Sequence, residues 1–154
     1  MNLAVTISLF GGGPGSGCHG PNCGRPGGSD VNFVDDIPSY YKKEAPPEFF
    51  RYTDTVFDTL DLSNVEVQHQ DLVTQSVRKW QRAISRGKKV PALVVAPNPK
   101  GGYFLLDGNH RAVALEDSRS SQVRVAILKP KEGFSWVRKV NINTRSVWFE
   151  LEKK

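Results

Sequence analysis

The stretch that decides the fold runs from Tyr103 to Leu115 and reads "YFLLDGNHRAVAL". Its first half is a short apolar run typical of a buried strand, and its second half has the apolar spacing that begins an amphipathic helix. The polar residues between them, Asp107 to Arg111, therefore stand where a strand turns into a helix. Because the first N–H groups of a helix have no partner within it, such a place binds anions readily.

Each residue of this polar cluster has a chemical role that fits an anion site. Gly108 permits the sharp turn, and Asn109 is a typical helix cap. Arg111 offers a planar fork for phosphate oxygens, and we expect its loss to weaken anion binding without unfolding the chain. His110 adds a donor, and Asp107 can hold Mg²⁺, orient His110 or act as a base. An ordinary helix start, with a buried His110 and a surface Arg111, would account for the same pattern.

Further strand and helix signals surround this stretch. They predict a strand in "NVEVQ" (64–68), a helix over 72–86 that ends at Gly87, a strand in "VPALVVAP" (90–97), a turn in "NPKGG" (98–102) and a strand in "QVRVAIL" (122–128). The tail "SVWFELE" (146–152) alternates and predicts a C-terminal strand at the edge of the sheet. This order of elements predicts an α+β fold.

Residues 60–130 resemble the ParB/sulfiredoxin superfamily. The likeness rests on a strand that opens with Pro, a turn, a strand that ends in a Gly-x-His-Arg signature, a helix with small residues and a closing strand. It implies a small mixed sheet with packed helices and a nucleotide-phosphate site at Gly108, His110 and Arg111. Sulfiredoxins have a reactive Cys where this chain has Asn109, so the resemblance does not extend to sulfinic acid reduction.

Asp107 matches the variant of this signature found in small-molecule kinases and ParB-like nuclease domains. The resemblance then leaves two functions open. In the first, a nucleoside triphosphate and Mg²⁺ bind at the cluster for nuclease or phosphoryl-transfer chemistry, with Asp107 as metal ligand or base, His110 as general acid and Arg111 as charge clamp. Glu66 is the candidate for a second carboxylate. In the second, a non-catalytic DNA-binding or phage-structural module keeps the fold.

Charge is divided unevenly along the chain, whose formal net charge is +5. Residues 30–66 hold three bases and nine acids, whereas residues 67–154 hold 17 bases and seven acids. On the expected helix 72–86 and just beyond it, bases recur away from the apolar face. They are Arg78, Lys79, Arg82, Arg86, Lys88 and Lys89. This stripe predicts a nucleic-acid-binding surface, and an ordinary solvated helix face is the alternative.

The first 29 residues have a composition of their own. Half of residues 11–28 are Gly, which predicts a flexible arm, and the stretch resembles Gly-Pro-rich segments of phage head-associated proteins, so that we expect a mobile-element origin. Cys18, His19 and Cys23 lie close together there. They would hold a structural zinc ion only with a distant fourth ligand, such as His69 or His110.

The remaining expectations concern organisation and location. Residues 30–60 are acidic, aromatic and interrupted by Pro, so we expect short helices or an extended segment there and the folded domain over 61–154. The start "MNLAVTISLF" lacks a basic n-region, and no apolar run approaches the ~20 residues that span a bilayer. We expect an intracellular protein, in the host cytoplasm if it is phage-encoded, without a membrane partner.

Overall fold

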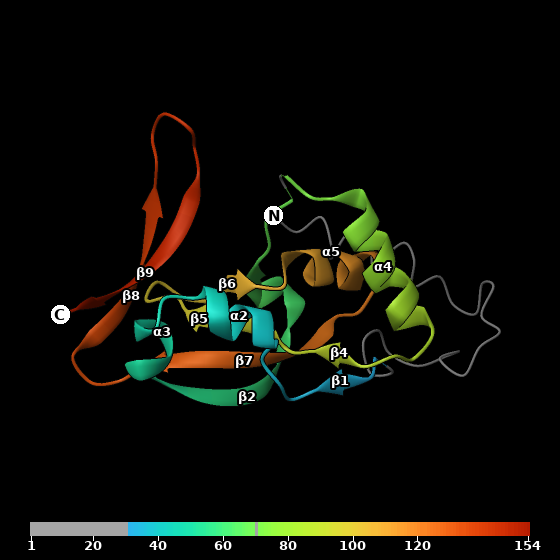
Figure 1. Cartoon of the computed structure of the whole chain (residues 1–154), viewed down its shortest axis with the longest axis horizontal. Coiled ribbons are helices and arrows are strands. Elements are labelled where there is room, and N and C mark those ends of the chain that lie inside the picture. The colour runs from blue at the N-terminus through green and yellow to red at the C-terminus, as the bar shows by residue number, and fades with distance from the viewer. Residues whose placement is uncertain (1–30, 70) are drawn as a thin grey trace.

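The computed structural model describes residues 31–69 and 71–154, and the arm predicted for residues 1–29 lies outside them. The elements follow one another as β1 (Phe33–Val34), α2 (Ser39–Glu44), α3 (Glu48–Arg51), β2 (Thr53–Asp61), the 3-10 turn η1 (Leu62–Asn64), β3 (Val65–Glu66), α4 (Thr74–Ser85), β4 (Val90–Pro91), β5 (Leu93–Pro97), β6 (Tyr103–Asp107), α5 (Asn109–Asp117), β7 (Gln122–Pro130), β8 (Phe134–Val140) and β9 (Val147–Lys153) (Figure 1).

A five-stranded mixed sheet organises these elements. Its order is β2-β7-β5-β6-β3, in which β5 runs parallel to β7, β3 runs parallel to β6, and the other neighbours are antiparallel. The short strands β1 and β4 pair in parallel, and β8 and β9 form an antiparallel hairpin whose tip projects from the body (Figure 1). The prediction of an α+β fold with a small mixed sheet and packed helices is confirmed.

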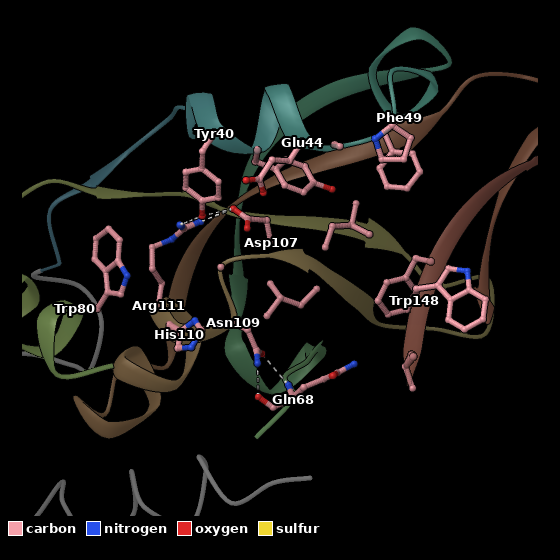
Figure 2. Close-up of a pocket in the computed structure, with 18 residues that line it drawn as sticks. Tyr40, Glu44, Phe49, Gln68, Trp80, Asp107, Asn109, His110, Arg111 and Trp148 are labelled. Atoms are coloured by element: carbon pink, nitrogen blue, oxygen red, sulfur yellow. Dashed lines mark hydrogen bonds and ion pairs between the residues drawn. The ribbon is translucent and has the colours of Figure 1, made fainter. Parts of the chain in front are cut away.

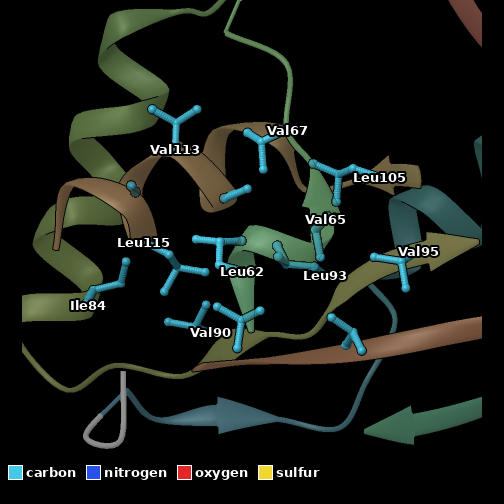
Figure 3. Close-up of a cluster of buried hydrophobic side chains, with 14 of the residues drawn as sticks. Leu62, Val65, Val67, Ile84, Val90, Leu93, Val95, Leu105, Val113 and Leu115 are labelled. Atoms are coloured by element: carbon cyan, nitrogen blue, oxygen red, sulfur yellow. The ribbon is translucent and has the colours of Figure 1, made fainter. Parts of the chain in front are cut away.

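The central strands are continuously apolar because both faces of the sheet are covered. On β5, Leu93 and Val95 join a core that includes side chains of α4 and α5, part of which Figure 3 shows. Val94 and Ala96 point to the other face and join a core with α2, α3 and Trp136. Alternate side chains of β5 therefore belong to two separate cores, one on each face of the sheet.

Helix α4 matches its prediction within two residues at each end. Val77 and Ile84 are buried on its inner face, and Trp80 packs against the same core. Gly87 follows the helix with φ +68°, a conformation that glycine adopts without a Cβ penalty. None of the helices in the described part of the chain has the length and apolar character needed to cross a bilayer.

The expectation of irregular structure for residues 30–60 is only half right. The short helices α2 and α3 are there, but Thr53–Asp61 is a nine-residue strand, β2, paired with β7 along its whole length. Most of its residues are exposed or only half-buried, so no clear alternation of apolar and polar residues marks it in the sequence. Because β2 ends at Asp61, it crosses the predicted domain boundary.

The expectation that the C-terminal strand joins the edge of the sheet is wrong. The predicted strand exists as β9, but it pairs with β8, a strand that the sequence reading missed. The hairpin lies against the sheet through side chains instead. Phe149 of β9 stacks on Phe104 of β6 with ring centroids 4.6 Å apart, and Trp136 of β8 contacts Phe49 edge to face at 4.7 Å.

Trp136 anchors the hairpin, which leads to a prediction about stability. It is 2% exposed, and its indole N–H donates to the carbonyl oxygen of Leu128 at 2.9 Å. We expect Trp136→Ala to lower the free energy of unfolding by about 3 to 5 kcal/mol, the usual cost of truncating a buried Trp. Urea unfolding measures this. Trp148→Ala on the same hairpin is the matched control, because Trp148 is 42% exposed, and equal losses in the two variants would contradict the anchoring role.

Candidate functional site

A cavity of about 670 Å³ lies among the start of α5, helices α2 and α3, and strand β9 (Figure 2). This volume falls within the range of small-molecule sites, roughly 300 to 1,000 Å³. The whole predicted cluster, Asp107 to Arg111, lines the cavity. The structure therefore brings the sequence-predicted residues of the strand-to-helix turn together at one concave surface.

The turn between β6 and α5 is built around Gly108. Its φ is +105°, and a Cβ at this position would come within 2.7 Å of Nη2 of Arg111 and 2.9 Å of Cδ2 of Leu93. Both the backbone conformation and the space therefore require glycine. The pairing of β5 with β6 shifts register beside the turn, between Val94 and Val95, and such bulges re-aim the side chains next to them.

Arg111 is buried, so it is not the surface arginine of the alternative explanation, an ordinary helix start. It is 2% exposed, Nη2 donates to the carbonyl oxygen of Ala92 at 3.1 Å, and Nη1 donates to the hydroxyl of Tyr40 at 3.3 Å. Its guanidinium carbon also lies 5.5 Å from the ring centre of Trp80. Nε is buried without a hydrogen-bond partner. The side chain thus holds together the residues around the turn, and its Nε–H remains without an acceptor.

Asp107 is tied to Arg111 and to helix α2. Its Oδ2 lies 3.6 Å from Nη2 of Arg111 and accepts a hydrogen bond of 2.8 Å from the hydroxyl of Tyr40. Partial burial raises the pKa of Tyr40, and the hydrogen bond to Asp107 raises this pKa further. Because the phenol stays protonated at neutral pH, its hydrogen remains available to the carboxylate. Asp107 therefore has a fixed orientation.

Asn109 does not cap the helix, which corrects its predicted role. Gly108 occupies the N-cap position, and no side chain caps the helix there. The amide of Asn109 instead pairs with the backbone of Gln68 in both directions. Its Oδ1 accepts from the N–H of Gln68 at 2.9 Å, and its Nδ2 donates to the carbonyl oxygen at 2.6 Å. Asn109 therefore fixes the loop between β3 and α4.

The same loop also engages His110 and Glu116 of α5. Nε2 of His110 accepts a hydrogen bond of 3.0 Å from the N–H of Val73, so in the neutral ring the proton sits on Nδ1. His69 lies 2.7 Å from Glu116, whose pKa is raised by burial and lowered in part by this hydrogen bond. The bond to Nε2 thus orients the ring of His110, and in the neutral ring Nδ1–H is the donor left for a ligand.

Of the two carboxylates predicted to bind a metal ion, Asp107 lines the cavity and Glu66 does not. Among residues 31–69 and 71–154, no three His, Cys, Asp or Glu side chains come together as a metal site. Glu66 does not line the main cavity, and it pairs with Arg138 at 3.3 Å. Cys18, His19 and Cys23 of the zinc hypothesis lie outside the described residues. The second carboxylate of the cavity is Glu44 of α2.

Outside the turn Asp107–Arg111, sequence reasoning singled out none of the residues that line the cavity as a site residue. Tyr40, Tyr41 and Glu44 come from α2, and Trp148 comes from β9. One local signal was available, because Tyr40 and Glu44 are four residues apart and so share one face of a helix. Nothing local, however, relates that face to residues nearly 70 positions further along the chain.

The six bases predicted to bind nucleic acid lie on or just after α4, and all are exposed. Lys79 lies over the ring of Trp80 at 5.5 Å. The ion pairs found in the described residues involve none of the six. The acidic N-terminal segment pairs elsewhere, with Asp35 bound to Arg124 and Asp36 to Lys42. The stripe is therefore not neutralised by the acids of that segment that the structure describes.

Comparisons with known proteins give partial structural likenesses. No protein-family model and no curated protein sequence matches the chain. A sulfiredoxin from Arabidopsis thaliana overlaps 50% of this chain and 89% of its own, with TM-score 0.43 and 20% identity. A conserved hypothetical protein from Pyrococcus furiosus overlaps 60% of this chain and 44% of its own, with TM-score 0.45 and 19% identity.

A mutant of free serine kinase in complex with ADP overlaps 72% of this chain, with TM-score 0.46 and 18% identity. The overlap covers 46% of the kinase chain, so this chain spans less than half the length of the kinase, as it does for the Pyrococcus protein. Similarity at this level assigns no function. Membership of the ParB/sulfiredoxin superfamily stays a prediction from the sequence.

The burial of Arg111 predicts a structural cost for its removal. We expect Arg111→Ala to lower the free energy of unfolding by about 3 kcal/mol or more, because it opens a cavity and leaves the carbonyl of Ala92 without its donor. Arg111→Met, which keeps most of the volume, should lose less. Urea unfolding of both variants measures the difference. An Arg111→Ala protein as stable as the parent would contradict the supporting role.

Proposed function

We propose that the cavity binds a nucleotide through its phosphate groups at the start of α5. The observation that carries this proposal is the meeting of two sets of unused donors at one cavity. The first N–H groups of α5 belong to Asn109, His110 and Arg111 and have no carbonyl partner within the helix. Arg111 also lines the cavity, and its Nε is buried without a hydrogen-bond partner. Such donors at the positive end of a helix favour an anion.

The charges that line the cavity point to a cation beside the phosphate. Arg111 carries one positive formal charge, whereas Asp107 and Glu44 carry two negative formal charges. A di- or triphosphate alone would be repelled by this balance. Mg²⁺ is bound in proteins by one or two carboxylates together with substrate phosphates. Asp107, with Glu44 as the second carboxylate, therefore fits a Mg²⁺ ion that arrives with the nucleotide.

Phosphoryl transfer and nuclease activity stay predictions from the resemblance. The hydrogen bonds of the site limit which roles its side chains can take. Asp107 accepts from Tyr40 through Oδ2, so a metal ion would use Oδ1 or displace the tyrosine. His110 accepts from Val73 through Nε2, so a phosphate oxygen would meet Nδ1–H. These contacts favour a role for His110 in orienting the phosphate.

The test titrates the protein with ADP or ATP, each with and without Mg²⁺, and measures binding as an increase in thermal stability. We expect stabilisation of the parent in the presence of Mg²⁺, about 2.7 kcal/mol at 100 times the Kd. The Asp107→Asn variant should lose the part of the nucleotide-induced stabilisation that depends on Mg²⁺, because the neutral amide binds the cation weakly. Glu66→Gln is the matched control, since Glu66 does not line this cavity. A parent that binds neither nucleotide at millimolar concentration would overturn the proposal.

A second candidate function is nucleic-acid binding along α4, favoured by the exposure of all six bases without acidic partners among the described residues. Arg78, Arg82 and Arg86 recur at intervals of four residues, about 6 Å apart along one face of the helix. Lys88 and Lys89 extend the stripe past the end of α4. Three or four phosphate contacts would give weak, sequence-independent binding that fades as salt increases.

Reversing the three arginines to Glu tests this surface. With Arg78, Arg82 and Arg86 replaced, we expect DNA binding at low salt to disappear while the fold survives, because all three side chains are exposed. In the parent, log K should fall with log salt at a slope of about −3. The control reverses the exposed Lys129, Lys131 and Lys153, which lie on or next to other elements. Equal loss of binding in both triple variants would indicate a net-charge effect and no α4 site.

A further inference from the structure

We propose that the cavity and the basic stripe on α4 form one continuous site, which binds the end of a single nucleic-acid strand with its terminal phosphate at the start of α5. This inference rests on the proposed function, because it uses the same phosphate site. It goes further in the class of ligand, since the bound nucleotide is then the last one of a strand. It also joins two surfaces that the proposed functions treat separately.

Trp80 connects the two surfaces. It belongs to α4 and lines the cavity next to Arg111 (Figure 2). The guanidinium carbon of Arg111 lies 5.5 Å from the centre of the Trp80 ring, and Nζ of Lys79 lies 5.5 Å from the same centre. The two cationic groups are therefore separated by no more than twice this distance. Because one strand of DNA advances about 3.4 Å per nucleotide, about three nucleotides cover the separation.

From Lys79 a row of bases continues along α4. Arg82 and Arg86 follow Lys79 by three and seven residues, a spacing that places side chains on one side of a helix. The row extends about 10 Å along the helix axis, and Lys88 and Lys89 come just after its end. All five side chains are exposed. In the part of the chain that the structure describes, the ion pairs involve none of them, so their charges are available to phosphates.

The donors at the start of α5 favour a terminal phosphate over an internal one. A terminal phosphate has three free oxygens and about two negative charges at neutral pH, whereas a phosphate within the strand has two free oxygens and a single charge. The site offers the first N–H groups of α5, which have no carbonyl partner within the helix, and Nδ1–H of His110. A terminal phosphate can use more of these donors at once.

The size of the cavity also limits how much of a strand it can hold. Its volume of about 670 Å³ lies in the range of sites for single small molecules. This size suits one nucleotide, so the rest of the strand must lie outside the cavity. The row of bases on α4 begins beside the same cavity wall, at Lys79, and provides a path for the phosphates that follow.

Three forms of one single-stranded DNA of about ten nucleotides test the inference by fluorescence anisotropy with Mg²⁺. They have a 5′-phosphate, a 3′-phosphate or hydroxyl groups at both ends. We expect one of the phosphorylated forms to bind about tenfold or more tightly than the hydroxyl form, the effect of a hydrogen bond to a charged group. Saturating ADP with Mg²⁺ should abolish this advantage, because ADP occupies the cavity.

A pair of lysine variants tests the contribution of α4. We expect Lys79→Gln to weaken binding of the phosphorylated DNA by about 2- to 5-fold, the range for an exposed charge pair. Lys129→Gln on β7 is the matched control, because Lys129 is also exposed and removes the same charge. It should leave the affinity unchanged.

The outcomes distinguish this inference from the proposed function. A parent that binds neither ADP nor any form of the DNA overturns both. A parent that binds ADP but binds the three forms equally, without displacement by ADP, overturns the inference and leaves the nucleotide site in place. Equal weakening by Lys79→Gln and Lys129→Gln overturns the inference as well, since binding would then depend on net charge alone. Phosphate-dependent binding that ADP displaces and Lys79→Gln alone weakens supports it.

Discussion

The buried guanidinium of Arg111 is the contact on which the rest of the site depends. From the first turn of α5 it reaches the carbonyl of Ala92 between β4 and β5, the hydroxyl of Tyr40 on α2 and the ring of Trp80 on α4. Elements that are remote in sequence therefore meet at one side chain. Gly108 is part of the same arrangement, because any Cβ there would occupy the space that the guanidinium and Leu93 fill. The absence of a side chain at Gly108 therefore makes room for the guanidinium of Arg111.

This arrangement explains how the turn can be exposed to a ligand and still be rigid. Asp107 is held by Tyr40, Asn109 by the backbone of Gln68 and His110 by the backbone of Val73. Each of these three side chains thus has a protein partner that fixes it, while the first N–H groups of α5 stay without carbonyl partners within the helix. Preorganised donors lose little freedom when an anion binds, which favours affinity.

The sequence predicted what depends on local spacing. The strand β6, the turn at Gly108, the helix α5 and the apolar face of α4 follow from patterns within a few residues, and the structure contains them. The sequence did not predict strand β2, because the side chains of β2 lack a clear alternation of apolar and polar residues. It also did not predict the burial of Arg111, because the sequence around a first-turn arginine is the same whether the side chain contacts water or a distant carbonyl. Tyr40 and Trp148 reach the site only through long-range packing, for which one sequence has no local signal.

The residues that line the cavity differ in what they do for the fold. Gly108 and Arg111 maintain the packing of the sheet and helices as well as the turn, so substitutions there change stability. Tyr40 is 48% exposed, but its hydroxyl donates to Asp107 and accepts from Arg111, so it takes part in holding the turn. Trp148 is 42% exposed on a projecting hairpin, and a residue of this kind can change without a cost to the core. The turn into α5 is thus the constrained part of the cavity.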